Sequence, residues 1–308
     1  MGLGARLNKL PAKPEWPTLL VAAGVYGGWF AATWFHAHIP WPVLAAIGGW
    51  LIAWHGSLQH EVIHGHPTPW RRVNLALALP PLSLWLPFEP YRASHVEHHN
   101  FAHLTDPDHD PESFYLKSGD GWRAALAVGA MRLEQSLIGR LTLGPIIEPI
   151  RFWAAEIGLI AGGDARHLRI VASHLLMAGI VWAWLRLACH MNLGLYLLTF
   201  VYPGTALTLL RSFAEHRAHP EPARRTATVE CAPILGLLFL NNNLHLAHHL
   251  RPDAPWYALP ALHRRERQRL AAMSGGFVYA GYADVFRRYL SRPHDSVTHD
   301  EAMAARGA

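Results

Sequence analysis

Histidine is the residue type whose number and spacing most clearly indicate chemistry in this chain. The sequence contains 22 histidines among 308 residues. One pair is spaced H-x-x-x-H, and the pattern H-x-x-H-H occurs twice, at 95–99 and at 245–249. Residues three or four positions apart share one face of an α-helix, so each cluster can present its imidazoles together. The candidate metal ligands are His60, His64, His95, His98, His99, His216, His245, His248 and His249.

Nine imidazoles exceed the three or four protein ligands of one zinc site and would suffice for two metal ions. Imidazole binds iron, copper and zinc, so these residues alone do not select the metal. Asp106 and Asp110 could hold ligating imidazoles through their second ring nitrogen, or could be loop and cap residues. Asn242 could bond a ligand or substrate, or could serve the entry of a helix.

A competing interpretation comes from His60-Glu61-Val62-Ile63-His64, which fits the H-E-x-x-H pattern of zinc metalloproteases. In that chemistry the histidines hold zinc and the glutamate acts as the base. An intramembrane protease would need a third ligand, commonly an aspartate in a later apolar segment, and those segments contain no Asp or Glu. The protease is therefore a distant alternative. Glu61 is better interpreted as a carboxylate beside a ligand, or as a helix residue.

Long charge-free runs indicate the elements that must position these histidines. No Asp, Glu, Lys or Arg occurs between Glu15 and Glu61, between Arg169 and Arg186, or between Arg186 and Arg211. A membrane-spanning helix needs about 20 mostly apolar residues. These runs predict four spans, at about 18–37, 41–59, 170–189 and 192–211.

The distribution of basic residues predicts how the spans are oriented. The short loops at 36–41 and 186–192 carry between them only Arg186, whereas 60–169 and 212–308 are rich in arginine. The positive-inside rule then places both termini and both large polar segments in the cytoplasm. We expect a multi-pass protein, of a bacterial inner membrane.

The predicted fold is an all-α integral membrane protein with two transmembrane helical hairpins and a cytoplasmic helical cap. We interpret 1–308 as a single domain, with the cap at 60–169 and 212–290 and a loose tail at 291–308. The net charge of +5 suits an anionic lipid surface or an acidic protein partner. This net charge can equally reflect the basic residues that set the membrane topology. We expect no nucleic-acid partner.

The three histidine clusters and the segments after them resemble the membrane fatty acid desaturase and hydroxylase superfamily. The stretches that carry the resemblance are HEVIH, HVEHH, HLAHH, HHNFAHLTDPDHDPES and HHLRPDAPWYALP. The resemblance covers roughly 50–265 and implies that the nine histidines hold two Fe²⁺ ions that activate O2. Acyl-CoA desaturases of this superfamily carry an asparagine one helical turn before the histidine that corresponds to His216. The corresponding residue here is Ser212.

The chemistry implied is removal of hydrogen from an unactivated C–H bond of a membrane lipid or another hydrophobic molecule. We expect desaturation of an acyl or lipid chain. The alternative is a hydroxylase or ketolase of the same superfamily, acting on an alkane, a carotenoid or a small amino-acid-derived compound. A metal-binding transporter is more distant. The two cysteines form no C-x-x-C pair, and no G-x-G-x-x-G fingerprint follows a strand. We therefore expect a separate ferredoxin- or rubredoxin-like electron donor.

Overall fold

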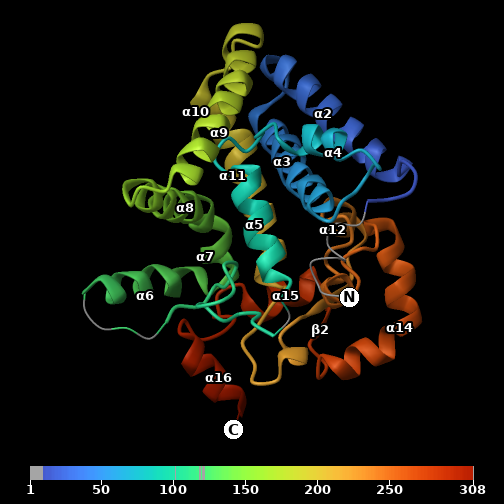
Figure 1. The fold of residues 1–308 in the computed structure, drawn as a ribbon, viewed down its shortest axis with the longest axis vertical. Helices are drawn as coiled ribbons and strands as arrows, with labels where there is room; N and C mark the ends of the chain where they lie inside the picture. Colours follow the sequence, from blue (N-terminus) through green and yellow to red (C-terminus); the bar gives the residue numbers. More distant parts are fainter. Residues whose placement is uncertain (1–9, 101, 118, 120–121, 308) are drawn as a thin grey trace. The chain divides into compact units, whose positions relative to one another are not determined.

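The computed structural model describes residues 10–307 other than 101, 118, 120 and 121, and is mostly helical. The chain divides into two compact units (Figure 1). One, here called the hairpin unit, comprises Leu10–Arg92 and Gly144–Thr208. The other, here called the histidine unit, includes Ala93–Leu143 and Leu209–Ala308. The interpretation of 1–308 as one domain stays a prediction.

The hairpin unit contains the long apolar helices. It comprises α2 (Trp16–Trp34), α3 (Trp41–Ile63), α4 (Arg71–Ala78), α8 (Gly144–Ala161), α9 (Ala165–Ala183), α10 (Leu193–Tyr196), the first residues of α5 (Phe88–His98) and those of α11 (Tyr202–Phe213). A short 3₁₀ turn, η1 (His36–His38), lies between α2 and α3, and two π-helical turns, η2 (Trp184–Ala188) and η3 (Leu197–Val201), continue α9 and α10.

Two continuous helical stretches of the described chain are long and apolar enough to cross a membrane. They are Ala165–Ala188 and Leu193–Phe213, which correspond to the third and fourth predicted spans. The first two spans are helical as expected, but α2 and α3 are not apolar enough to qualify. Their glycines, tryptophans and tyrosine contribute little hydropathy, and α3 ends in polar residues. The four-span topology therefore stays a prediction.

Glycines let α3 pack closely against the stretch formed by η3 and α11. A Cβ atom added at Gly48 would lie 2.4 Å from the backbone oxygen of Thr199. One added at Gly204 would lie 2.4 Å from the Cβ of Ile52. Small residues permit such backbone approach, as in the interfaces between membrane helices. The α3 helix, which carries His60, is held in place by this contact.

The end of α3 is fixed by a turn held by side chains. The helix ends at Ile63, and Gly65 follows with φ of 97°, a left-handed conformation that favours glycine. The side-chain amide of Asn74 donates to the backbone oxygens of Gly65 and Thr68, both at 2.9 Å. Because the turn is tied to α4, the backbone that follows His64 has a defined course.

The histidine unit consists of shorter helices and one small sheet. Its helices are the end of α5, α6 (Trp122–Glu134), α7 (Leu137–Thr142), the end of α11, α12 (Pro233–Leu238), α13 (His245–Leu250), α14 (Leu259–Met273), α15 (Tyr282–Tyr289) and α16 (His299–Gly307), with 3₁₀ turns η4 (Pro222–Arg224) and η5 (Trp256–Ala258). The all-α prediction omitted a parallel pair of strands, β1 (Thr228–Cys231) and β2 (Val278–Gly281), in which Val229 lies opposite Tyr279.

The segment from Ser291, expected to be loose, includes α16 and is tied back to the histidine unit. The Tyr115 hydroxyl donates to Asp295 at 2.6 Å and accepts from the backbone N–H of Ala218 at 2.7 Å. Arg306 donates to Asp295 at 2.6 Å, and Ala302 of α16 is buried against Tyr115 and Ala218. The end of the chain thus contributes to the core of this unit.

Candidate metal centre

Two short helical segments of the histidine unit carry the H-x-x-H-H clusters, here called the second histidine box (95–99) and the third histidine box (245–249), with 60–64 as the first. The last turn of α5 presents His95, His98 and, just beyond it, His99. The six-residue helix α13 presents the other three. Before α13, Leu240 and Asn241 adopt positive φ angles, and the Asn243 side chain donates to the Val229 oxygen of β1 at 2.7 Å. That bond fixes the start of α13 against the sheet.

Seven histidines of this unit, those of the two boxes and His216, form two groups, and each group takes histidines from both boxes. His95, His99 and His248 form one group, and His98, His216, His245 and His249 form the other, with the candidate ligand atoms of each group within 4.8 Å of one another. Within each box, the pair four residues apart joins one group and the third histidine joins the other. One helical turn takes 3.6 residues, so position i+3 falls just short of a full turn and position i+4 just beyond it. The two side chains therefore point in different directions, and one helix can supply ligands to two sites.

The Nε2 atoms converge within each group. Nε2 of His216 lies 3.0 Å from that of His98 and 2.9 Å from that of His245, which in turn lies 3.1 Å from that of His249. In the other group, Nε2 of His99 lies 3.1 Å from those of His95 and His248. Nitrogens that each bind a metal at about 2.1 Å are separated by about 3.0–3.4 Å, so both groups fit a bound metal ion.

The two groups lie directly beside each other. The ring of His99 in one group stacks on that of His249 in the other, with centroids 4.5 Å apart. The rings of His95 and His98 are also stacked, at 5.7 Å. All but one of the seven residues are buried, and His216 is partly buried. This arrangement can hold two metal ions as close neighbours.

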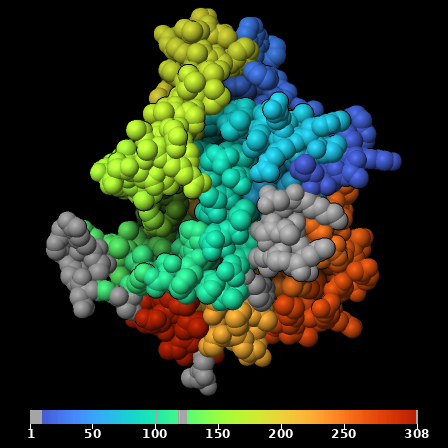
Figure 2. Space-filling model, in the orientation of Figure 1, coloured from blue at the N-terminus to red at the C-terminus, as the bar shows by residue number. Residues whose placement is uncertain are grey.

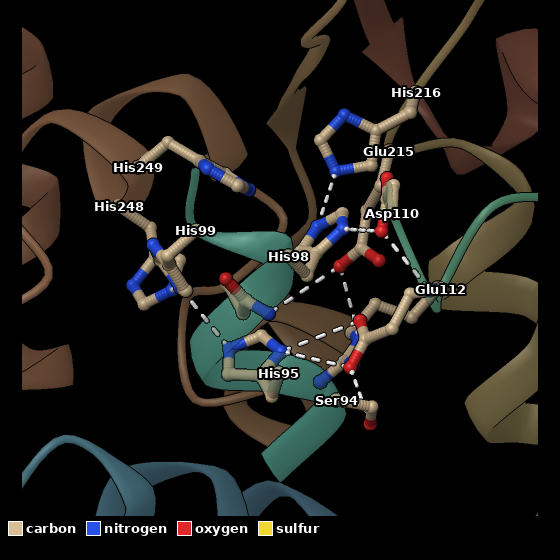
Figure 3. Close-up of polar contacts among 12 residues, drawn as sticks. Ser94, His95, His98, His99, Asp110, Glu112, Glu215, His216, His248 and His249 are labelled. Atoms are coloured by element: carbon tan, nitrogen blue, oxygen red, sulfur yellow. Dashed lines mark hydrogen bonds and ion pairs between the residues drawn. The ribbon is translucent and has the colours of Figure 1, made fainter. Parts of the chain in front are cut away.

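Carboxylates hold the outer ring nitrogens (Figure 3). His98 donates from Nδ1 to Asp110 Oδ1 at 2.9 Å, and His95 donates from Nδ1 to Glu112 Oε1 at 3.2 Å. A carboxylate only accepts hydrogen bonds, so the proton lies on Nδ1 and the lone pair on Nε2 points at the other imidazoles. Ligating histidines in metalloproteins are oriented by such partners.

His245 is oriented by an amide and a third carboxylate. Its Nδ1 lies 3.0 Å from Asn242 Oδ1 and 3.4 Å from Glu215 Oε1. The Asn242 amide donates to Glu215 at 3.3 Å, which leaves its oxygen free to accept from the imidazole. Arg211 lies 3.0 Å from the same Glu215 oxygen. The structure thus places Asn242 beside a histidine, and its role as the partner of a metal ligand stays a prediction.

Burial and charge set the protonation states at the cluster. Burial lowers the pKa of His216, His245 and His249 well below the usual range, so these imidazoles are neutral, the form that binds metal. Burial also lowers the pKa of His98, but the charges of Glu112 and Asp110 outweigh it and raise the pKa to about 8, so that without metal this imidazole also carries a proton on Nε2, which a bound metal ion would displace. Burial raises the pKa of Glu112, yet His95 and His98 bring it down to about 2.

His60 and His64 lie in the hairpin unit and form a pair of their own. Both are buried, and their ring centroids are 4.7 Å apart. Glu61 is also buried, with Oε1 3.9 Å from Nδ1 of His60. This distance is too long for a direct hydrogen bond. The interpretation of Glu61 as a carboxylate beside a metal ligand stays a prediction.

Two of the expected supporting residues form hydrogen bonds with groups other than the seven histidines. Asp106 bonds His109 Nδ1 at 2.9 Å on the surface of the loop after α5. The Ser212 hydroxyl donates to the backbone oxygen of Leu209 at 3.2 Å, within its own helix. Sequence reasoning missed Glu112 and Glu215. The available signals were the acidic run D-P-D-H-D-P-E and the direct adjacency of Glu215 to His216.

A mostly helical chain with two adjoining groups of buried imidazoles has a site suited to metal ions. The sequence matches the fatty acid desaturase family over residues 32–281, most of the chain. The chain therefore belongs to this family and is an oxidoreductase of the desaturase superfamily. It is also similar to a beta-carotene ketolase of Paracoccus sp. (strain N81106 / MBIC 01143), with 26% identity over 265 residues, which cover 79% of this chain and 91% of that protein.

Proposed function

We propose that this chain is an O2-dependent, membrane-bound oxidoreductase in which the nine candidate histidines hold two iron ions. The observation that supports it best is the pair of adjoining groups whose Nε2 atoms converge at about 3 Å. His60 and His64 supply further ligands in this proposal, because they belong to the same sequence pattern. Bound iron would supply the activation of O2 needed to remove hydrogen from an unactivated C–H bond.

The chain's own residues prepare the site for that chemistry. Asp110 and Glu112 keep a proton on Nδ1 of His98 and His95, so that the Nε2 lone pairs stay directed inward. Asn242 and Glu215 do the same for His245. Burial of the imidazoles excludes water, which limits side reactions of a strongly oxidising centre. Preorganisation of the ligands is thus the protein's contribution.

For the reaction at carbon, we place oxygen insertion first, as in a hydroxylase or ketolase. The likeness to a beta-carotene ketolase spans nearly all of that protein, which supports a long, rigid hydrocarbon such as a carotenoid as substrate. Ser212, where acyl-CoA desaturases carry asparagine, is in line with a departure from acyl-chain chemistry. Burial of such a substrate is favoured by about 25 cal/mol for each Å² of apolar surface removed from water.

Desaturation of an acyl or lipid chain is the second candidate. The family match and the segment Pro252–Tyr257 after the third box, which resembles that of acyl-lipid desaturases, support it. The two reactions share the first hydrogen removal and differ afterwards. Either a neighbouring hydrogen leaves or oxygen returns to the carbon.

Expression in a host that contains both acyl lipids and β-carotene, grown under labelled O2, separates these reactions. Mass analysis of the extract should find labelled oxygen in the hydrocarbon product. An unlabelled acyl product that has lost two hydrogens would instead establish the desaturase. Cells that express the His98→Ala variant are the control. Iron-loaded protein that yields neither product, with an active electron donor present, would contradict the proposal.

We further propose that an acidic ferredoxin- or rubredoxin-like protein delivers electrons at α14. This helix, which belongs to the orange part of the surface in Figure 2, exposes Arg264, Arg265, Arg267 and Arg269. On its other side, Leu259 and Leu270 pack in one buried cluster with Leu246 and Ala247 of α13, the helix that carries the third histidine box. Packed helices lie about 8–10 Å apart, so a donor bound here would be close to the imidazoles.

The membrane topology proposed from the sequence is multi-pass, with the termini and the metal centre in the cytoplasm. Reporter fusions at residues 38, 95, 190 and 245 test it. Positions 95 and 245 should report the cytoplasm and positions 38 and 190 the opposite side. A fusion at 95 that reports the outside would contradict the topology, because the two boxes that carry residues 95 and 245 adjoin.

A further inference from the structure

The loop that follows α5, residues 102–113, has an inner and an outer face. On the inner face, buried Asp110 accepts hydrogen bonds from His98 Nδ1 and from the backbone N–H of Thr105 at 2.8 Å. On the outer face lie His103, Asp106 and His109, which belong to neither group of the histidine cluster. The His109 side chain is 58% exposed, so the outer face is open to solvent.

Successive turns of the loop align these three side chains. The backbone N–H of Asp106 donates to the oxygen of His103 at 3.0 Å, and that of His109 donates to the oxygen of Asp106 at 3.1 Å. A chain that turns every three residues places side chains i, i+3 and i+6 above one another. The rings of His103 and His109 are accordingly stacked, with centroids 4.7 Å apart.

We propose that His103, Asp106 and His109 form a separate binding site for a divalent cation of the zinc type. One ligand atom from each residue lies within 4.8 Å of the other two. Asp106 Oδ2 already contacts His109 Nδ1 at 2.9 Å, while Oδ1 is held by the backbone N–H of Asp108. Small rotations of the half-buried His103 and the exposed His109 side chains would bring all three ligand atoms to one ion.

The ligand set selects the class of ion. Two imidazole nitrogens and one carboxylate oxygen, with the remaining position open to water, suit a tetrahedral zinc-type ion, whereas calcium and magnesium prefer oxygen alone. Arg225 donates to the backbone oxygens of Ala102 and Leu104 behind the loop. Its positive charge opposes a cation, so this exposed site binds more weakly than the buried cluster. The proposal does not depend on the reaction assigned above.

Titration of the full-length protein with Co²⁺, with its iron in place, tests the site. Tetrahedral cobalt complexes absorb visible light, so binding is read without any assay of activity. We expect one Co²⁺ per chain beyond the iron, with the iron content unchanged. The variant carrying His103→Asn and His109→Asn should lose this ion. Asp106→Asn should weaken Co²⁺ binding by at least about tenfold. Loss of a residue that only hydrogen-bonds a metal ligand already has an effect of this size.

Matched variants separate the site from general effects. Asp108→Asn, which removes a neighbouring carboxylate that pairs with Lys117, should bind Co²⁺ unchanged, as should His190→Asn. If the double variant also loses iron, the Co²⁺ titration of the Asp106→Asn variant is compared with that of the unchanged protein instead. If the preparation lacks iron, the histidine cluster can also bind Co²⁺. The unchanged protein should then still bind one Co²⁺ per chain more than the double variant. Equal titration curves for the unchanged and double-variant proteins would overturn the proposal.

Discussion

His98 Nδ1 and Asp110 Oδ1 lie 2.9 Å apart, and both residues are buried. The other oxygen of Asp110 accepts from the backbone N–H of Thr105, and Oδ1 also accepts from that of Glu112 at 2.9 Å. One carboxylate therefore joins an imidazole of the cluster to two points of the loop after α5. The orientation of His98 depends on the fold of that loop.

Replacement of Asp110 by asparagine should weaken metal binding by about 10–100-fold. An amide offers one oxygen and one NH2 group, so either His98 or the Thr105 N–H would face a donor instead of an acceptor. Metal content per chain after purification measures the effect. Asp108→Asn, a change to an exposed carboxylate of the same loop, is the control. Full metal content in Asp110→Asn would show that the carboxylate is not required.

The unchanged protein should contain close to two irons per chain, and alanine at His98 or His248 should abolish activity while the protein stays in the membrane. Each substitution removes one imidazole from a different group of the cluster. His263→Gln is the control, because His263 is a buried histidine of α14 that bonds Glu230 rather than the cluster. A single tightly held zinc, with activity in both alanine variants, would contradict the di-iron proposal.

Acid should destabilise the protein through His294, which lies outside the candidate spans. Burial lowers its pKa from 6.5 to about 4, and its Nε2 lies 3.1 Å from the Tyr279 hydroxyl, which donates to the neutral ring. The unfolded chain binds a proton near pH 6.5 and the folded chain only near pH 4. The stabilisation is therefore present above pH 6.5 and is lost as the pH falls toward 4, by about 1.4 kcal/mol per unit at most.

Unfolding in detergent between pH 7 and pH 4 measures this dependence. The His294→Gln variant should show a shallower loss of stability over the same range, because glutamine does not titrate. The comparison needs identical detergent and salt for both proteins. Parallel curves for the two proteins would mean that His294 does not account for the acid sensitivity.

The glycine contact between α3 and η3 should tolerate no side chain. Gly48→Ala places a Cβ 2.4 Å from the backbone oxygen of Thr199, which cannot move aside as a flexible side chain would. Such overpacking costs about 1–3 kcal/mol. At Gly27 of α2 an added Cβ meets nothing within 4 Å, and alanine there should be neutral or favour the helix by about 0.5–1 kcal/mol. Thermal unfolding in detergent compares the two, and equal stability would refute the packing argument.

Electron transfer should depend on salt and on the arginines of α14. Reversal of charge at Arg264 and Arg265 should slow transfer from an acidic donor, and the effect should shrink as ionic strength rises, because exposed charges are screened beyond about 8–10 Å in physiological salt. Arg166→Glu, an exposed arginine of the hairpin unit, is the control. Full turnover with NADH and the purified chain alone would exclude a separate donor.

The positions of the long helices could be predicted from charge alone. The run between Glu15 and Glu61 became α2 and α3, and the two later runs became the stretches Ala165–Ala188 and Leu193–Phe213. Charge-free runs of this length predict where long helices lie, because the charged residues that bound each run can be read directly from the sequence. The sequence could not show that α3 and η3 meet at Gly48, since that depends on which faces pack.

The histidine boxes were also visible in the sequence, but their division was not. That His98 joins His245 and His249 while His248 joins His95 depends on how α5 and α13 face each other. Glu112 and Glu215 were missed for the same reason, since a carboxylate becomes a partner only when the fold brings it to a ring nitrogen. The segment that includes α16 is held by Tyr115, whose partner Asp295 lies 180 positions away in the sequence. A contact over this separation could not be predicted from the sequence.

The distance along the chain between the two boxes bears on how the protein is made. His99 and His248 are 149 residues apart, although their Nε2 atoms are 3.1 Å apart. A ribosome therefore exposes the α5 histidines well before α13 exists, and the third and fourth predicted spans are made in between. Neither group of imidazoles can be completed on the nascent chain until His248 and His249 of α13 have been synthesised. Insertion of a metal ion into either group is thus a late step, which follows the synthesis of the apolar helices.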